Sequence, residues 1–297
     1  MGKGSKIEWL AIPGTLPATW NPIRARNKIT GKIGWFCTPK SHGCDHCYAD
    51  SFNLARGNGI AYLPSLASDV EVFLDDRFLR MPLAWPKAST IFPCSMTDLF
   101  GEFVADEWLD MIFAVMAIRK DHTFITTTKR PARMRAYLDS ATTLGRIWAR
   151  GIQMLGANGF VMSERLEQWP LKNVWAGVSV CDGGAIDHDF MRELEATPAH
   201  LRWVSYEPAI GFFDVEPYAH FVDWLVMGGE SGSTRAFHLE WAYDNIGACY
   251  DHDIPFFLKQ LGRRPIYRGQ ALKLEARKGE NPEEWPASLQ GMRSFPV

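Results

Sequence analysis

Three cysteines stand close together in the segment Cys37-Thr-Pro-Lys-Ser-His-Gly-Cys44-Asp-His-Cys47. Thiolates are ligands of soft metals and of iron–sulfur clusters, and three thiolates on one loop can each bind one iron of a cubane [4Fe-4S] cluster. The fourth iron then stays open to a substrate or cofactor, as the open position does in catalytic zinc sites. The spacing Cys-x6-Cys-x2-Cys therefore predicts a metal or cluster site that carries out chemistry.

Zinc is the alternative metal that these residues could bind. His42 or His46 would supply the fourth ligand of a Cys3His zinc site. We favour the cluster because the loop belongs to a large core-forming chain rather than to a small hairpin module. Of the remaining cysteines, we expect Cys94, Cys181 and Cys249 to be buried thiols, although Cys94 could also act as a hydrogen-atom donor or a further cluster ligand.

The composition is that of a globular chain with no overall charge preference. Its 297 residues are 46% hydrophobic, which is enough for one barrel-sized domain or two smaller ones. Lys and Arg number 32 against 34 Asp and Glu, so attraction to nucleic acid must come from local patches. Cysteine usage and the lack of a long apolar segment predict a cytoplasmic protein with no membrane partner.

Short apolar runs alternate with amphipathic segments along the chain. Seven runs are expected to be strands: 33–36, 90–94, 122–128, 173–180, 201–208, 223–230 and 254–260. Helices are expected over 105–120, 187–197 and 239–252. The alternation predicts an α/β fold with a mostly parallel sheet. Because the runs at 201 and 223 are too close for a full crossover, we expect a partial or irregular TIM-like (β/α) barrel of about six to seven strands.

The domain prediction follows from this pattern. The barrel domain is expected over 1–262, with an N-terminal arm over 1–32 and an inserted connection over 139–172. Residues 263–297 are rich in Arg, Lys, Pro and Glu, and we expect a basic C-terminal extension packed on or trailing from the barrel.

Nine stretches of the sequence resemble a phage-associated family of radical SAM proteins that is distantly similar to spore photoproduct lyase. They are IEW (7–9), ATWNP (18–22), the cysteine loop with Tyr48, SMTDLF (95–100), HTFITTTKRP (122–131), NVWAGVSV (173–180), SYEPAIG (205–211), VMGGESG (226–232) and PFFLKQLG (255–262). The loop is longer than the Cys-x3-Cys-x2-Cys of most radical SAM enzymes.

The resemblance implies a radical SAM barrel in which Cys37, Cys44 and Cys47 hold a [4Fe-4S] cluster. S-adenosylmethionine (SAM) would be cleaved to a 5′-deoxyadenosyl radical that abstracts hydrogen from the substrate. The electron would come from a one-electron reductant such as flavodoxin or ferredoxin. If the protein is phage-encoded, the compartment would be the cytoplasm of the bacterial host.

The residues expected around SAM follow the strand ends. The resemblance suggests Lys129 for the methionyl carboxylate and Ser95 with Asp98 for the methionyl amine. The full set of cofactor contacts is His46, Tyr48, Ser95, Asp98, Lys129, Ser179 and Glu207. The set expected to serve the substrate or catalysis is Glu230, Arg130, Lys259, Gln260 and Cys94. Ordinary structural roles stay open, since Asp98 could cap a helix and both glutamates could belong to turns.

Basic residues gather in three groups that could contact a phosphate backbone. They are Arg24, Arg26, Lys28 and Lys32; Lys129, Arg130, Arg133 and Arg135; and Arg263, Arg264, Arg268, Lys273, Arg277 and Lys278. With the resemblance, they imply a base in nucleic acid as substrate, such as a modified pyrimidine in DNA hypermodification or base repair, with an isomerase, lyase or other base-modifying activity. The alternatives are a zinc-containing, non-catalytic nucleic-acid-binding protein and a radical SAM enzyme acting on a small molecule or peptide.

Overall fold

The computed structural model describes residues 4–155, 168–232 and 235–296. The chain divides into two compact units. The first comprises Met1–Pro39, Tyr48–Ala176 and Ala196–Leu201, and the second comprises Lys40–Cys47, Gly177–Glu195 and Arg202–Val297. The cysteine loop is therefore divided, with Cys37 in the first unit and both Cys44 and Cys47 in the second.

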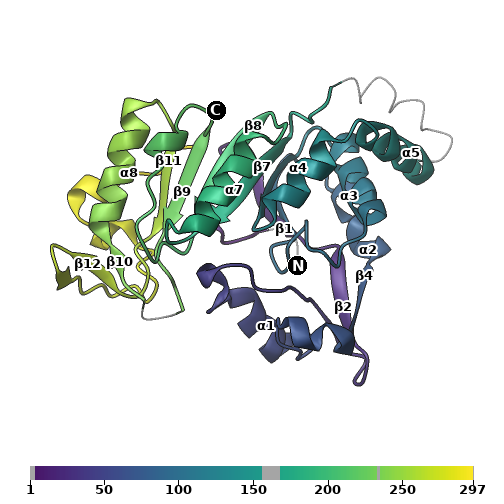
Figure 1. Cartoon of the computed structure of the whole chain (residues 1–297), viewed down its shortest axis with the longest axis horizontal. Coiled ribbons are helices and arrows are strands. Elements are labelled where there is room, and N and C mark those ends of the chain that lie inside the picture. The colour runs from purple at the N-terminus through teal and green to yellow at the C-terminus, as the bar shows by residue number, and fades with distance from the viewer. Residues whose placement is uncertain (1–3, 156–167, 233–234, 297) are drawn as a thin grey trace. The chain divides into compact units, whose positions relative to one another are not determined.

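A seven-stranded parallel sheet is the main element of the fold (Figure 1). Its strands are β1 (Leu16–Trp20), β5 (Ser89–Pro93), β6 (Thr123–Thr128), β7 (Val174–Val180), β8 (Leu201–Tyr206), β9 (Trp224–Gly228) and β11 (Phe256–Gln260). Their order in the sheet follows their order in the chain. This arrangement confirms the predicted α/β fold of the partial (β/α) barrel type.

Helices connect most of these strands, as parallel pairing requires. They are α3 (Asp106–Ile118) between β5 and β6, α4 (Pro131–Asp139) and α5 (Thr143–Leu155) between β6 and β7, α7 (Ala185–Glu195) between β7 and β8, and α8 (Leu239–Asp251) between β9 and β11. Between β8 and β9, the fully described segment 207–223 contains a single 3-10 turn, Glu216–Tyr218. The predicted abbreviated crossover is therefore confirmed.

The prediction that the run at 33–36 is a strand of the parallel sheet is wrong. Within that run, Ile33–Gly34 forms the two-residue strand β3, which pairs antiparallel with β2 (Ile23–Asn27). Strand β4 (Val70–Leu74) pairs on the other side of β2, and the three make a separate small sheet. The first strand of the parallel sheet is β1, which the sequence analysis missed because Pro17 interrupts its apolar pattern. Proline is tolerated there because β1 is an edge strand.

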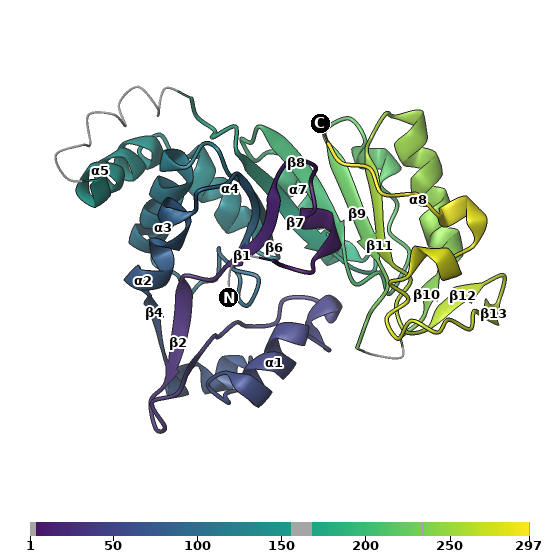
Figure 2. The ribbon, with the colours of Figure 1, turned by 180° about the vertical axis from the view of Figure 1, so that it is seen from behind.

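The first unit has its core beneath α3. Leu109, Ile112, Phe113 and Met116 on this helix are at most 1% exposed. Figure 2 shows α3 beside α2 (Asp76–Leu79) and α5, both of which it contacts. The predicted insertion over 139–172 contains α5, and its residues 156–167 lie outside the described part. Helix α1 (Tyr48–Arg56) directly follows the cysteine loop.

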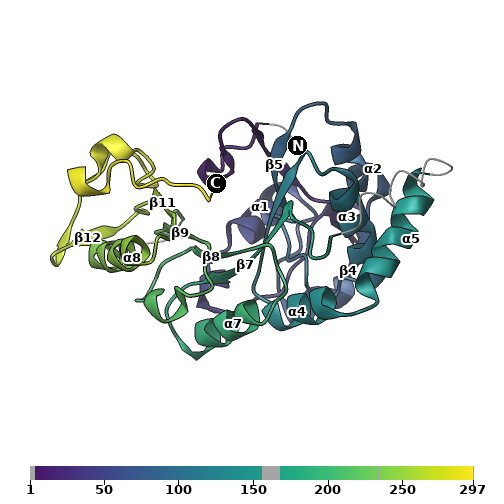
Figure 3. The same cartoon turned by 90° about the horizontal axis from the view of Figure 1, so that it is seen from above.

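The second unit packs α8 beside β11 and beside a small mixed sheet (Figure 3). That sheet consists of β10 (Phe237–His238), β12 (Pro265–Tyr267) and β13 (Gln270–Ala271). The predicted C-terminal extension lies within this unit, and its Met292 carbonyl accepts a hydrogen bond from the Leu258 amide of β11. Trp203 and Trp224, fully buried on β8 and β9, pack with ring centroids 5.4 Å apart.

Short 3-10 helices complete the described elements. They span Glu8–Leu10, His42–Cys44, Pro64–Asp69, Met81–Ala84, Glu216–Tyr218, Pro282–Glu284 and Ala287–Leu289. Among the described helices, none has the length and apolar character needed to cross a membrane.

Candidate functional site

The backbone on both sides of Cys37 is fixed by polar side chains of the first unit. The Phe36 carbonyl accepts a hydrogen bond from Thr97 Oγ1 at 2.5 Å. The Thr38 carbonyl accepts one from Arg130 Nη2 at 2.8 Å, and the same nitrogen donates to Thr38 Oγ1. The half-buried Cys37 thiol is thus held at a defined place rather than on a loose loop.

Arg130 is itself part of a buried ionic network. Its Nη1 donates to Asp98 Oδ2 at 3.0 Å and its Nε to Glu102 Oε2 at 2.6 Å. The side chains of Arg130 and Asp98 are 5% and 8% exposed. Burial alone would lower the pKa of Arg130, but Asp98, Cys37 and Glu102 together raise it above its ordinary value. A permanent positive charge therefore lies near the Cys37 sulfur.

Asp98 accepts several hydrogen bonds within the first unit. Its Oδ1 accepts from Thr128 Oγ1 at 2.6 Å and from the Phe100 amide at 2.9 Å. Its Oδ2 accepts from the Lys129 amide at 3.0 Å, in addition to Arg130. This carboxylate connects the segments that follow β5 and β6, and through Arg130 it is linked to Thr38. The predicted contacts of Asp98 and Arg130 with SAM or substrate stay predictions, and the structure adds this structural role to both.

Two other predicted residues, Cys94 and Ser95, lie at the end of β5, and a third, Tyr48 of α1, contacts Ser95. Cys94 is 2% exposed and adopts a left-handed backbone with φ of 57°, which is strained for a residue with a Cβ. Burial, with smaller contributions from Asp98 and Cys37, raises the pKa of its thiol. Ser95 Oγ accepts from Asn21 Nδ2 at 3.1 Å, and the Ser95 carbonyl accepts from the Tyr48 hydroxyl. Tyr48 is 59% exposed, so its ring is accessible.

The second part of the cysteine loop, Lys40–Cys47, belongs to the second unit. The Lys40 amide donates to Cys44 Sγ at 3.5 Å, which fixes the position of this sulfur relative to the backbone. His42 Nδ1 lies 2.9 Å from Asp182 Oδ2, and both His42 and His46 are exposed. Cys44 and Cys47 are half-buried, and all six cysteines of the chain are thiols rather than disulfides.

Polar residues from several strands of the second unit meet at the carboxyl ends. Lys259 Nζ of β11 lies 2.7 Å from Glu207 Oε1, which follows β8. Ser179 Oγ of β7 donates to the Glu207 carbonyl at 3.1 Å. Gly228 at the end of β9 leaves room for this pair, since a Cβ there would lie 3.1 Å from Glu207 Oε1. Three predicted residues are thus brought together, and the ion pair balances their charge.

Gln260 and Glu230 continue this polar edge. Gln260 Nε2 donates to the Gly229 carbonyl at 2.8 Å. The side chains of Gln260 and Glu230 are almost fully buried. Glu230 accepts two hydrogen bonds from Arg235, one of them from Nε at 2.8 Å. These bonds are the main reason that the pKa of Arg235 is raised. Sequence analysis missed Arg235 because a lone arginine after a Gly-Ser loop carries no motif signal.

One described group of three potential metal ligands is compact, with ligand atoms within 4.8 Å of one another: Cys181, Asp182 and Asp187. Asp187 Oδ2 accepts from the amides of Cys181, Asp182 and Gly183 at 2.7 to 3.0 Å. These bonds satisfy the buried carboxylate and fix the loop after β7. We therefore interpret the group as a structural support for Asp182, which contacts His42.

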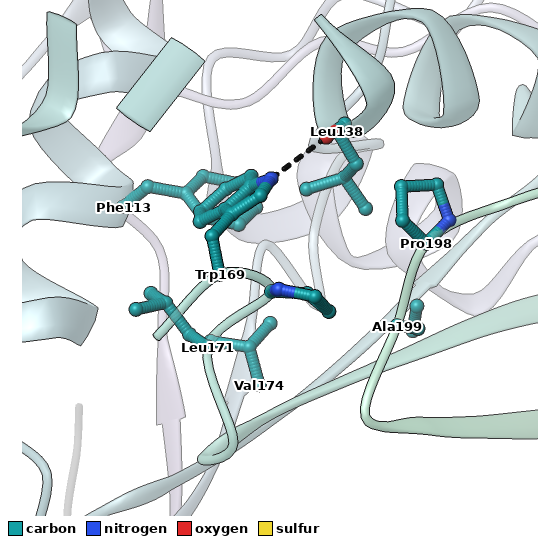
Figure 4. Close-up of a pocket in the computed structure, with 9 residues that line it drawn as sticks. Phe113, Leu138, Trp169, Leu171, Val174, Pro198 and Ala199 are labelled. Atoms are coloured by element: carbon teal, nitrogen blue, oxygen red, sulfur yellow. Dashed lines mark hydrogen bonds between the residues drawn. The ribbon is translucent and has the colours of Figure 1, made fainter. Parts of the chain in front are cut away.

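A small apolar cavity lies away from this chemistry, at the amino end of β7. Figure 4 shows Phe113, Leu138, Trp169, Leu171 and Val174 around it, with the Trp169 indole N–H donating to the Leu138 carbonyl at 2.9 Å. Its volume of about 10 Å³ corresponds to one water molecule at most. It is a packing space between α3, α4 and β7 rather than a ligand site.

The fold defines the class of protein: an α/β partial barrel, here with three half-buried thiols in the loop 37–47. The chain belongs to the family described as "Protein of unknown function (DUF5131)", which matches residues 4–286. No curated protein and no solved structure matches the chain.

Proposed function

We propose that this protein is a radical SAM enzyme that binds a [4Fe-4S] cluster through Cys37, Cys44 and Cys47. The observation that carries the proposal is that all three are half-buried thiols on a backbone held by hydrogen bonds. Half-buried thiols can reach a cluster while shielding it partly from water. The donor set fits the cluster, since three thiolates suit a cubane with one open iron.

The residues near the sulfurs have roles that do not depend on the substrate. The Arg130 charge lies near Cys37, and the Lys40 amide donates to Cys44 Sγ. When bound, the cluster would supply one electron for the cleavage of SAM to a 5′-deoxyadenosyl radical. A reductant such as flavodoxin or ferredoxin would deliver that electron in the cytoplasm. The protein's part is to bind SAM, orient it and exclude water.

The polar strand ends are suited to the aminoacyl group of SAM. Its ammonium and carboxylate have charges opposite to those of Glu207 and Lys259, whose ion pair could exchange for contacts with this zwitterion. Ser179 would add a hydroxyl from β7. In the first unit, Lys129 offers an ammonium group and Ser95 a hydroxyl group. Tyr48 offers an exposed ring for stacking.

The test is anaerobic purification of the native chain and of Cys44→Ala. We expect the native protein to contain close to four iron and four sulfide ions, to absorb near 400 nm and to release 5′-deoxyadenosine from SAM when reduced. Cys44→Ala should lose most of the iron and all cleavage. Cys249→Ala is the matched control, because Cys249 is buried on α8 and should leave the iron content unchanged. A native protein without iron and sulfide after anaerobic reconstitution would contradict the proposal.

We further propose a base in nucleic acid as the substrate. The basic group over 263–278 supports it best, because all six of its Arg and Lys residues are exposed. The guanidinium of Arg268 also lies 5.0 Å from the Tyr267 ring, which leaves an aromatic surface beside positive charge. In the other two groups, Arg130 and Arg133 donate to the protein itself, and Arg24 lies between Trp35 and Phe78.

Binding to single- and double-stranded DNA at several salt concentrations tests this substrate class. We expect affinity to fall with salt, and the triple change Arg263→Gln, Arg264→Gln and Arg268→Gln to lower the slope of log K against log salt by about 2 to 3. Lys28→Gln, at the first basic group, should lower it by less than about 1. Absence of binding at low salt would favour a small molecule or peptide as substrate.

One observation favours zinc as a second candidate. The contact between His42 Nδ1 and Asp182 leaves Nε2 for a metal, as in the carboxylate–histidine pairs that orient zinc ligands. A zinc protein would be colourless and would contain one zinc per chain without sulfide. His42→Gln would then lower metal content, whereas it should leave a cluster held by the three cysteines in place.

A further inference from the structure

The part of the cysteine loop in the second unit has almost no apolar anchoring. Its residues 40–47 are all exposed or half-buried, and the single 3-10 turn His42–Cys44 contains no buried residue. A short surface turn of this kind opens easily unless polar contacts hold it. Its position, and therefore that of the Cys44 and Cys47 sulfurs, depends on polar contacts and close backbone packing with the rest of the unit.

Arg235 makes two contacts with this turn. Its Nη1 donates to the His42 carbonyl at 2.8 Å and lies 3.3 Å from Asp45 Oδ2. The Arg235 guanidinium thus holds the backbone just before Cys44 and the side chain just after it. Both contacts use one nitrogen, so the opposite side of the planar guanidinium is available to a second partner.

Glu230 is that second partner, and its backbone is fixed next to the parallel sheet. It accepts from Nε and Nη2 of Arg235 in a bidentate geometry and is only 6% exposed. It directly follows Gly228 and Gly229 at the end of β9, and its carbonyl accepts from the Arg263 amide at 2.9 Å. The rigid end of a parallel strand therefore aims the guanidinium at the loop.

The loop after β7 supports the same turn from another direction. His42 Nδ1 lies 2.9 Å from Asp182 Oδ2, and Ser41 Oγ lies 3.8 Å from Cys181 Sγ. Gly43 packs so closely that a Cβ there would lie 3.2 Å from the Cys181 Cβ. This contact limits sideways movement of the turn but does not reach Asp45.

We propose that Arg235, oriented by Glu230, is a positioning residue that holds the turn carrying Cys44 and Cys47 in the geometry needed to bind metal. The inference rests on the proposed function in that the bound group is taken to be a cluster, although the same support would serve any metal on these thiols. Arg235 would act through the backbone and Asp45, with no contact to the bound group.

Site-resolved alkylation of the full-length chain, treated with a chelator, tests the proposal without any activity assay. Iodoacetamide labelling is followed by mass spectrometry at each cysteine, for the native protein and for Arg235→Gln. We expect labelling of Cys44 and Cys47 to become about tenfold faster, because the turn opens more often. Cys37, which Arg130 and Thr97 hold, and the buried Cys249 should change less than about twofold. The matched control is Arg192→Gln, an exposed arginine of the same unit paired with Asp189.

Each outcome decides the question. Unchanged rates at Cys44 and Cys47, relative to Arg192→Gln, would overturn the proposal. If labelling of Cys249 also becomes faster, the substitution has opened the whole unit. The same labelling experiment on Arg235→Lys then tests the proposal instead. Lysine keeps a charge against Glu230 but cannot reach the loop at the same time, so a selective rise supports the proposal and no rise contradicts it.

Metal content separates this inference from the proposed function. Reconstituted Arg235→Gln should retain less iron than the native protein after gel filtration. If the alkylation rates change as expected but the native chain never binds iron and sulfide, the positioning role stands and the radical SAM proposal fails.

Discussion

Two arginines contact the cysteine loop, one in each unit, and they differ in burial. Arg130 is 5% exposed and donates to two carboxylates and to Thr38. Arg235 is 25% exposed and donates to Glu230, to the His42 carbonyl and to Asp45. Both connect a carboxylate near the end of a parallel strand to a backbone carbonyl of the loop.

The difference indicates two ways of holding a thiol. Around Arg130, the guanidinium and Asp98 are desolvated, although Glu102 is exposed, so disruption of the pair leaves the Asp98 charge buried without its cation. Around Arg235, the carboxylate is equally buried, since Glu230 is 6% exposed, but the guanidinium is 25% exposed, so its removal opens a path for water to Glu230 and frees the turn. We infer that Cys37 is held more rigidly than Cys44 and Cys47.

Removal of Arg130 should give the largest effect on stability. Arg130→Leu leaves the Asp98 carboxylate, 8% exposed, without its cation, and we expect a loss of about 3 to 5 kcal/mol in the free energy of unfolding. Urea denaturation at pH 7, followed by circular dichroism, measures this loss.

The matched change in the other unit is Arg235→Leu. We expect it to cost about 1 to 2 kcal/mol, because water can enter where the 25% exposed guanidinium lay and solvate Glu230, which is 6% exposed in the native chain. Equal losses for the two variants would show that burial does not distinguish the two arginines, and the comparison would have to be given up.

The fold was predictable because its signals are local and repeated. Strands β5 to β9 and β11 are short apolar runs, and α3, α7 and α8 have helical spacing, so the α/β class followed. The small antiparallel sheet was missed, since β3 has two residues and β2 carries Arg24 and Arg26 among its apolar positions. Cation–π contacts of these arginines with Trp35, Phe78 and Phe73 allow them to lie in a sheet. Such contacts cannot be predicted from the alternation of apolar and polar residues along the strand.

The candidate site was predictable as a set of residue types but not as a set of contacts. The ion pair between Glu207 and Lys259 joins residues far apart in the sequence, and parallel strand ends predicted only that they share an edge. Thr38 and Arg235 were missed because each acts through a backbone carbonyl or a neighbouring charge. Hydrogen bonds of this kind depend on where distant segments lie in the folded chain, and the spacing of residues in a single sequence does not predict this.

Crowding at Gly229 provides a second way to test the comparison. A Cβ at this position would lie 2.4 Å from the Leu261 carbonyl oxygen, so Gly229→Ala must shift the backbone that carries Glu230. We expect a loss of about 1 to 3 kcal/mol, together with faster alkylation of Cys44 and Cys47 but not of Cys37. Thermal and urea unfolding with cysteine labelling provide the measurement.

Gly247 in α8 is the matched control for that change. A Cβ there meets no atom within 4 Å, so Gly247→Ala should stabilise the chain by about 0.5 to 1 kcal/mol. If Gly229→Ala accelerated labelling of all three loop cysteines equally, the two parts of the loop would not be held independently.

The smallest expected effect comes from Thr38→Val, which removes one acceptor of Arg130. The Thr38 carbonyl, which accepts at 2.8 Å, is unchanged, so we expect a loss of about 0.5 to 1 kcal/mol and a change below about twofold in Cys37 labelling. Thr97→Val is the isosteric partner, because it removes the hydroxyl that donates to the Phe36 carbonyl. That carbonyl then loses its side-chain donor, so labelling of Cys37 should rise by more than in Thr38→Val. The reverse order would mean that Arg130 holds Cys37 through the Thr38 hydroxyl rather than through the backbone.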